Sequence, residues 1–135
     1  MDFMSWSDEY SVNVAQLDAQ HRHLVGLING LAEVMKRGSN PGELSALLED
    51  LLQYTNFHFD CEEKLMARAN FPGLAEHRAK HVAMKAEVQR LLTGATTSNA
   101  TTAMKLMAFL KNWLSRHIMG TDKQYAPVLN QAGIA

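Results

Sequence analysis

Two pairs of metal-binding side chains, each separated by four residues, constrain the fold of this chain more than any other feature of its sequence. His58 is followed by Glu62, and His77 is followed by His81. In an α-helix this spacing places the two side chains on one face, one turn apart. Each pair therefore offers two ligands to one metal ion if the chain around it is helical.

Apolar residues recur at steps of three and four along four stretches of the chain, a pattern typical of helices that pack in a bundle. These stretches cover about residues 18–37, 41–68, 73–92 and 101–119. We expect Asp18 to cap the start of the first helix and Gly38 to end it. Asn40 and Pro41 should open the second helix.

Short connections between these helices predict an all-α fold, an up-down-up-down antiparallel four-helix bundle. Residues 1–16 should form an N-terminal arm on its surface, and residues 121–135 a C-terminal tail. The chain has 135 residues, enough for one domain with its own core, so we interpret residues 1–135 as a single domain.

Charge and hydropathy exclude several classes of function. The formal net charge is −1, so neither nucleic acid nor an anionic membrane surface is an expected partner. No apolar run approaches the roughly 20 residues of a transmembrane helix and the N-terminus is unlike a signal peptide, so we expect no membrane insertion. Cys61 is the only cysteine, which suits a reducing compartment, and we expect a cytoplasmic protein.

Six polar residues interrupt the apolar seams of the predicted helices, and an antiparallel bundle brings all of them to one end. They lie near the start of the first and third helices and near the end of the second and fourth: His21, His58, Glu62, His77, His81 and His117. Burying so many polar groups without partners is costly, whereas a metal centre gives each of them a partner. In contrast, His23 lies two residues from His21 and should face solvent.

Asp122 is a candidate for a second carboxylate in this centre. It follows His117 by five residues, which is off one helical face, so we expect the helix to end or distort near Gly120. Five imidazoles and two carboxylates exceed the roughly four ligands of zinc and suit two metal ions bridged by carboxylates. If an oxide or hydroxide also bridges, one of about twelve octahedral positions stays open for a small ligand.

The ligand pattern resembles the hemerythrin family, and most closely its bacterial single-domain members. The residues that carry the resemblance are Asp18-x-Gln20-His21, His58-x3-Glu62, His77-x3-His81 and His117-x4-Asp122, together with Trp6, Tyr10, Asn70-Phe71-Pro72 and Tyr125. The likeness covers essentially the whole chain and fills all seven ligand positions.

The resemblance implies a non-haem di-iron centre with an oxo or hydroxo bridge that binds O2 reversibly, for oxygen carriage, storage or delivery. It implies this division of ligands: one iron held by His77, His81 and His117, the other by His21 and His58 with the open position, and bridges from Glu62 and Asp122. Such a protein is not an enzyme. Other small diatomics or anions are further candidate ligands, and the sequence indicates no protein recipient.

A dry pocket should surround the open position, because water promotes loss of the reduced state. Four residues next to the ligands are candidates for its wall: Phe59, Trp113, Leu114 and Ile118.

Alternative functions on the same bundle stay open: a di-iron oxidase or peroxidase, an O2 or redox sensor, or an iron-handling module. Ferritin-like di-iron enzymes use sites rich in Glu, whose anionic oxygens stabilise highly oxidised iron. Five neutral imidazoles do so less well, which favours reversible binding.

Two residues next to the candidate ligands are not expected to bind metal. Glu63 is one position off the helical seam, so we prefer Glu62 as the ligand. We interpret Cys61 as a small helix residue without a redox role.

Overall fold

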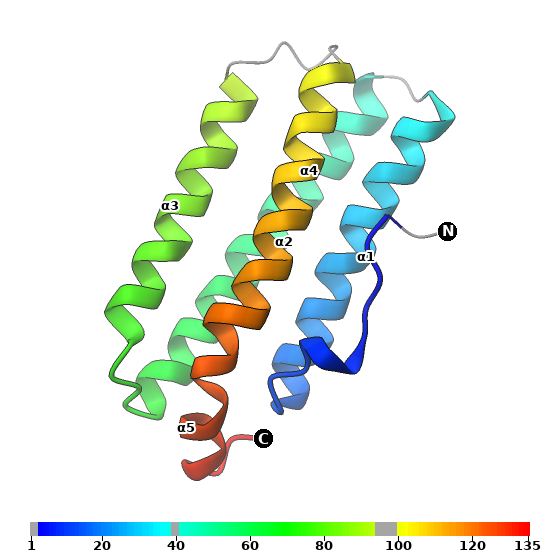
Figure 1. Ribbon diagram of the computed structural model, residues 1–135. Coiled ribbons are helices and arrows are strands. Elements are labelled where there is room, and N and C mark those ends of the chain that lie inside the picture. The colour runs from blue at the N-terminus through cyan, green and yellow to red at the C-terminus, as the bar shows by residue number, and fades with distance from the viewer. Residues whose placement is uncertain (1–2, 39–40, 94–99) are drawn as a thin grey trace.

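The computed structural model describes residues 3–38, 41–93 and 100–135, and contains no strand within these ranges. Its long helices form an antiparallel bundle (Figure 1): α1 (Ala15–Arg37), α2 (Pro41–Arg68), α3 (Leu74–Thr93) and α4 (Ala100–Arg116). Shorter helical segments flank them: η1 (Asp8–Tyr10), η2 (His117–Thr121), η3 (Asp122–Gln124) and α5 (Ala126–Gln131). The predicted all-α, up-down-up-down bundle is confirmed.

Helix α1 begins three residues earlier than predicted, and Asp18 is not its N-cap. The N-cap is Val14, and the backbone N–H of Asp18 already donates to the carbonyl of Val14 at 2.9 Å. The Asp18 carboxylate instead accepts hydrogen bonds from the Ser11 hydroxyl at 2.6 Å and from the Val12 backbone N–H at 2.8 Å. Asp18 therefore fastens the N-terminal arm to the first turn of α1, where the helix dipole also favours its negative charge.

The C-terminal end of α1 and the start of α2 follow the prediction where the structure describes them. Gly38 adopts the left-handed conformation with φ 74°, which a residue without a Cβ reaches at little cost, and its N–H bonds the carbonyl of Met35 at 3.2 Å. Pro41 is the first residue of α2. Asn40, the predicted cap, lies outside the described residues.

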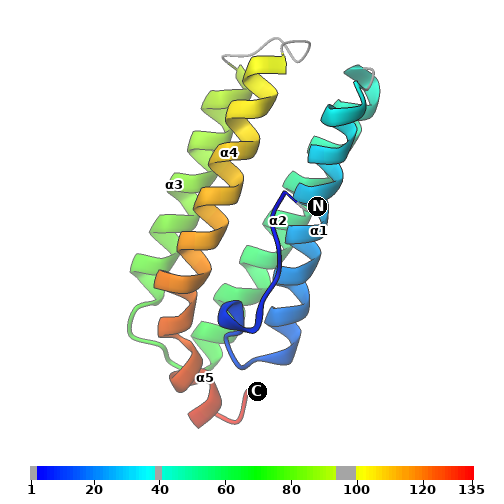
Figure 2. The same ribbon diagram turned by 45° about the vertical axis from the view of Figure 1, so that its right-hand side comes forward.

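The arm and the tail both pack against the bundle. The side chain of Asn29 on α1 holds the arm by binding both the N–H and the carbonyl of Met4, each at 2.7 Å. Figure 2 shows the arm running beside α1. Tyr125 and Leu129 of the tail are fully buried. Figure 1 shows α5 and the short helical turn of the arm at the same end of the bundle.

A tight turn between α2 and α3 sets the two ligand-bearing helices against each other. Asn70 has φ 57°, and the N–H of Phe71 bonds the carbonyl of Met66 at 2.9 Å. A Cβ at Gly73 would lie 2.8 Å from the Phe71 ring, so only glycine fits there without a shift of that ring.

Among the described residues, none of the helices combines the length and the apolar character that crossing a bilayer requires.

Candidate metal centre

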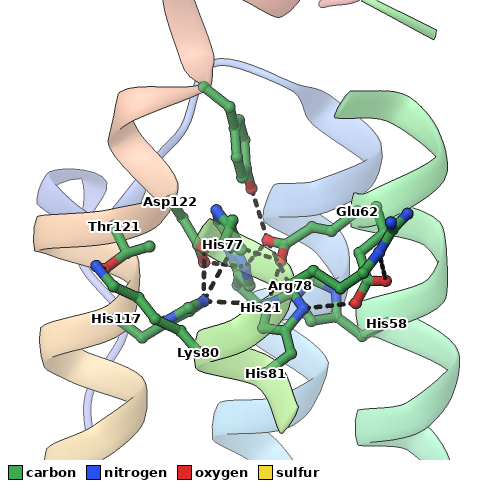
Figure 3. Close-up of polar contacts among 12 residues, drawn as sticks. His21, His58, Glu62, His77, Arg78, Lys80, His81, His117, Thr121 and Asp122 are labelled. Atoms are coloured by element: carbon green, nitrogen blue, oxygen red, sulfur yellow. Dashed lines mark hydrogen bonds and ion pairs between the residues drawn. The ribbon is translucent and has the colours of Figure 1, made fainter. Parts of the chain in front are cut away.

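The structure brings the seven predicted ligands together at the α5 end of the bundle (Figure 3). Five helical segments supply them: His21 from α1, His58 and Glu62 from α2, His77 and His81 from α3, His117 from η2, and Asp122 from η3. All seven are buried, with exposed fractions between 0% and 5%. His23, in contrast, is exposed as predicted and packs its ring on Tyr54.

A widened helical turn brings Asp122 to the centre. After Arg116 the chain leaves the α-helical pattern, and the N–H of Asp122 bonds the carbonyl of His117, five residues back. A π-helical turn of this kind holds one residue more than an α-turn, so residues five apart share a face. The predicted distortion near Gly120 is confirmed, and Gln124 satisfies the Gly120 carbonyl with a 2.7 Å side-chain hydrogen bond.

The ligand atoms separate into two groups, each confined to within 4.8 Å. One group consists of His77, His81, His117, Glu62 and Asp122, and the other of His21, His58, Glu62 and Asp122. The imidazoles are thus divided three to two, and both carboxylates belong to both groups. This is the arrangement that two metal ions with two shared carboxylate ligands require.

Each carboxylate directs one oxygen to each group of imidazoles. Glu62 Oε1 lies 3.2 Å from His81 Nε2, while Glu62 Oε2 lies 3.2 Å from His21 Nε2. Asp122 Oδ1 lies 2.9 Å from His117 Nε2, while Asp122 Oδ2 lies 3.1 Å from His21 Nε2. A carboxylate that bridges two ions presents its two oxygens in this way.

The imidazole nitrogens of the larger group are also spaced as ligands of one ion. His117 Nε2 lies 3.2 Å from both His77 Nε2 and His81 Nε2. Adjacent ligands of a six-coordinate ion, each at about 2.1 Å from it, lie about 3 Å apart. Three of the four carboxylate oxygens, Glu62 Oε1 and both oxygens of Asp122, accept no hydrogen bond despite full burial. Buried polar atoms rarely stay unsatisfied, and bound cations would satisfy these. The donor set therefore fits a pair of metal ions.

The electrostatics of the cluster show how strongly it favours positive charge. Burial opposes protonation of His21, but the adjacent carboxylates of Asp122 and Glu62 outweigh it and raise the pKa of His21 to about 10. The same balance raises the pKa of His77 to about 9. Burial also opposes ionisation of both carboxyls, yet the surrounding imidazoles hold the pKa values of Glu62 and Asp122 below their usual range. Protons occupy the places that metal cations would take.

Three further side chains orient the ligands from outside the cluster. His58 Nδ1 donates to Gln20 Oε1 at 2.6 Å, and His81 Nδ1 donates to Glu63 Oε2 at 2.8 Å. The Tyr125 hydroxyl donates to Glu62 Oε2 at 2.7 Å. Such partners fix which nitrogen of an imidazole faces the metal. The sequence predicts Glu62 rather than Glu63 as a ligand, and Gln20 and Tyr125 enter only as part of the pattern that resembles the family. A metal-ligating histidine generally needs a hydrogen-bond partner for its other ring nitrogen, and this need points to residues such as Gln20 and Glu63.

A small apolar cavity lies one helical turn from the ligands, towards the middle of the bundle. Its volume is about 20 Å³, and Phe59, Trp113 and Leu114 are among the residues that line it. The ring of Phe59 stacks on His81 at 3.7 Å, and the ring of Trp113 stacks on His117 at 4.1 Å. Ile118 is fully buried but does not line this cavity. Three of the four predicted wall residues therefore line one small apolar cavity.

Comparison with known proteins agrees with this geometry. Residues 12–129 match the family model for the hemerythrin HHE cation binding domain. The chain is 37% identical over 120 residues to a myohemerythrin of Riftia pachyptila, covering 89% of this chain and 88% of that protein. It is 31% identical over 135 residues to a bacteriohemerythrin of Methylococcus capsulatus, covering 96% and 99%.

Solved structures give the same result. The crystal structure of a wild-type hemerythrin superposes with a TM-score of 0.79 at 31% identity, covering 94% of this chain and 98% of that one. The match to the family model spans nearly the whole bundle and includes every residue of the cluster described above. The chain belongs to the hemerythrin family.

Proposed function

We propose that this protein binds O2 reversibly at a non-haem di-iron centre, for oxygen carriage, storage or delivery. One observation carries the proposal: Glu62 and Asp122 each direct one oxygen to each of two groups of imidazoles. Membership of a family whose members include bacteriohemerythrin and myohemerythrin supports it.

The lone free thiol, Cys61, suits a reducing compartment, so we also propose a cytoplasmic location.

We infer a position for each ion from the two groups of ligands. One iron would be held by His77, His81 and His117, the other by His21 and His58, with Glu62 and Asp122 between them. When bound, the iron pair supplies the electrons that O2 takes up on binding and returns on release. The second iron has one imidazole fewer than the first, so the exogenous ligand belongs on the side of His21 and His58.

The apolar cavity supports binding rather than oxidation of an organic substrate. At about 20 Å³ it exceeds the roughly 10–15 Å³ that one water molecule needs, but it is far smaller than the roughly 300–1,000 Å³ of a substrate pocket. Among the described residues that line the cavity, Thr55 carries the only hydroxyl, which donates to the carbonyl of Leu51 at 2.7 Å. A small apolar gas suits this space better than water does.

Metal analysis combined with an optical O2 titration tests the proposal. The purified protein should contain two irons per chain, and the anaerobically reduced form should develop a peroxide-to-iron charge-transfer band with O2. Removal of O2 should abolish that band. His21→Ala should lose iron, whereas His23→Ala, which alters an exposed ring two residues away, should behave like the wild type. Rapid turnover of hydrogen peroxide without a stable oxygenated form would support a peroxidase instead.

A further inference from the structure

A second pocket, of about 490 Å³, opens on the outer side of α3 and α4. Lys80, Trp113, Arg116 and His117 are among the residues that line it. Figure 3 shows the Lys80 side chain running beside His117 towards Thr121, whose hydroxyl lies 3.3 Å from the Lys80 ammonium. The volume is in the roughly 300–1,000 Å³ range of small-molecule sites.

The charge of this pocket is positive. Neither Lys80 nor Arg116 forms an ion pair within the described parts of the chain, and both side chains are exposed. No carboxylate is among the described residues that line the pocket. Two cations without a counter-charge attract anions to this position, although the protein as a whole carries a formal net charge of −1.

The same pocket reaches the metal centre through one of its ligands. His117 is 5% exposed, whereas the other six residues of the cluster are at most 2% exposed, so His117 is the ligand nearest to solvent. Trp113 stacks on the His117 ring with centroids 4.1 Å apart and planes 15° apart. Two conjugated rings therefore connect the cationic surface to the centre.

These three observations together point to a place of electron entry. Resting on the proposed function, we propose that the pocket docks a small anionic one-electron donor that returns oxidised iron to the ferrous state. In each encounter one electron passes from the donor through Trp113 and His117 to the iron pair, and the donor leaves oxidised by one electron. Two encounters restore both irons. No atom passes from donor to protein, and any accompanying proton comes from water.

Electron entry and O2 binding use different spaces in the protein. Trp113 lines both the cationic pocket and the apolar cavity, so it stands between them. A charged donor can reach the centre from the Lys80 side without entering the dry space next to Leu114. The protein is then re-reduced without wetting its O2 site.

Stopped-flow reduction of the diferric protein tests the proposal. Dithionite supplies the sulfur dioxide radical anion, which becomes sulfur dioxide when it loses one electron, and hexaammineruthenium(II) is a cationic one-electron donor. In the double variant Lys80→Glu/Arg116→Glu, reduction by the anion should slow at least about tenfold at low ionic strength, while reduction by the cation should not slow. Arg68→Glu/Lys105→Glu carries the same change in charge away from the pocket and should match the wild type.

A second measurement needs no metal. The chain has two tryptophans, so Trp6→Phe leaves Trp113 as the only one. In the metal-free full-length chain, iodide should quench Trp113 fluorescence less after Lys80→Glu/Arg116→Glu, whereas neutral acrylamide should quench it equally. Equal reduction rates for all variants with unchanged iodide quenching would overturn the inference. Failure of the wild type to load two irons or bind O2 would instead overturn the proposed function, whatever the iodide result.

Discussion

Glu63 Oε2 lies 2.8 Å from His81 Nδ1, so an anionic acceptor stands behind an imidazole whose Nε2 faces the metal centre. Arg78 binds the other oxygen of Glu63 at 2.9 Å. Burial opposes ionisation of Glu63, but His81 and Arg78 outweigh it and lower the pKa of Glu63, so the group stays charged. On the opposite side of the centre the corresponding partner is the neutral amide of Gln20 behind His58. The two metal positions therefore differ in the charge behind their ligands.

Glu63→Gln should weaken iron binding, because a neutral amide polarises the His81 ring less than a carboxylate does. Loss of an outer hydrogen-bond partner typically lowers metal affinity about 10–100-fold, and we expect the lower part of that range for this isosteric change. Competition with an iron chelator measures the effect. Glu49→Gln is the matched control, since Glu49 is exposed and bonds only to Gln53 among the contacts described. Equal affinities for both variants would show that His81 does not need the charge.

Tyr125→Phe should destabilise the folded protein by about 1–3 kcal/mol, because it removes a buried 2.7 Å hydrogen bond to the charged carboxylate of Glu62. Burial first, and then the charges of Glu62 and Asp122, hold the pKa of Tyr125 well above its usual value, so the hydroxyl remains a donor. Urea unfolding of wild type and variant gives the difference. Tyr10→Phe, which removes a part-buried hydroxyl that bonds Ser115, should cost less. An equal loss in both variants would contradict this role of Tyr125.

The metal-free protein should lose stability as pH rises above neutrality. The pKa values of His21 and His77 are about 10 and about 9 in the folded chain, against 6.5 ordinarily, so the folded state binds their protons more tightly than the unfolded state does. Their contribution is complete below pH 6.5 and disappears as pH passes 9 and then 10. Glu62 and Asp122 have lowered pKa values, so their contribution is present above the ordinary carboxyl range and is lost in acid.

Urea titrations of the metal-free chain at pH 6, 8 and 10 measure this loss. The iron-loaded protein is the control, because metal ions displace the protons from His21 and His77 and remove the alkaline loss. A metal-free chain as stable at pH 10 as at pH 6 would show that these imidazoles are not held protonated.

Trp113→Ala and Leu114→Ala should each speed autoxidation of the oxygenated protein, because both enlarge the apolar cavity and admit water. The effect should be greater at position 113, since that ring also closes off the outer pocket. Phe57→Ala removes an aromatic ring that is 53% exposed and should leave the rate unchanged. Decay of the charge-transfer band in air measures the rate. If neither variant decays faster than wild type, the two residues are not part of the pocket wall.

The position of the metal centre could be predicted from the sequence because two simple features determine it, the helical period and the alternating direction of the helices. A four-residue step fixes the helical face of His58 and Glu62, and alternating helix directions fix the level at which His21 and His117 meet them. Asp122 was predicted from the need for a second carboxylate. A break of the helix near Gly120 followed from the same need, but its form as a widened π-helical turn did not.

Residues whose roles depend on neighbouring elements were harder to predict. Asp18 has the chemistry of an N-cap, and only the path of the arm shows that it binds Ser11 and Val12 instead. Glu63 follows Glu62 directly, and its contact with His81 depends on how closely α2 packs on α3. Ile118 follows a ligand directly in the sequence and is fully buried, yet it does not line the cavity.

The Trp113 side chain separates the small apolar cavity from the cationic outer pocket, because it lines both of them. A change at this position that tightens one compartment alters the other at the same time. Under the functions proposed for the two spaces, the rate of autoxidation and the rate of re-reduction both depend on this one indole, so selection at position 113 acts on both rates together.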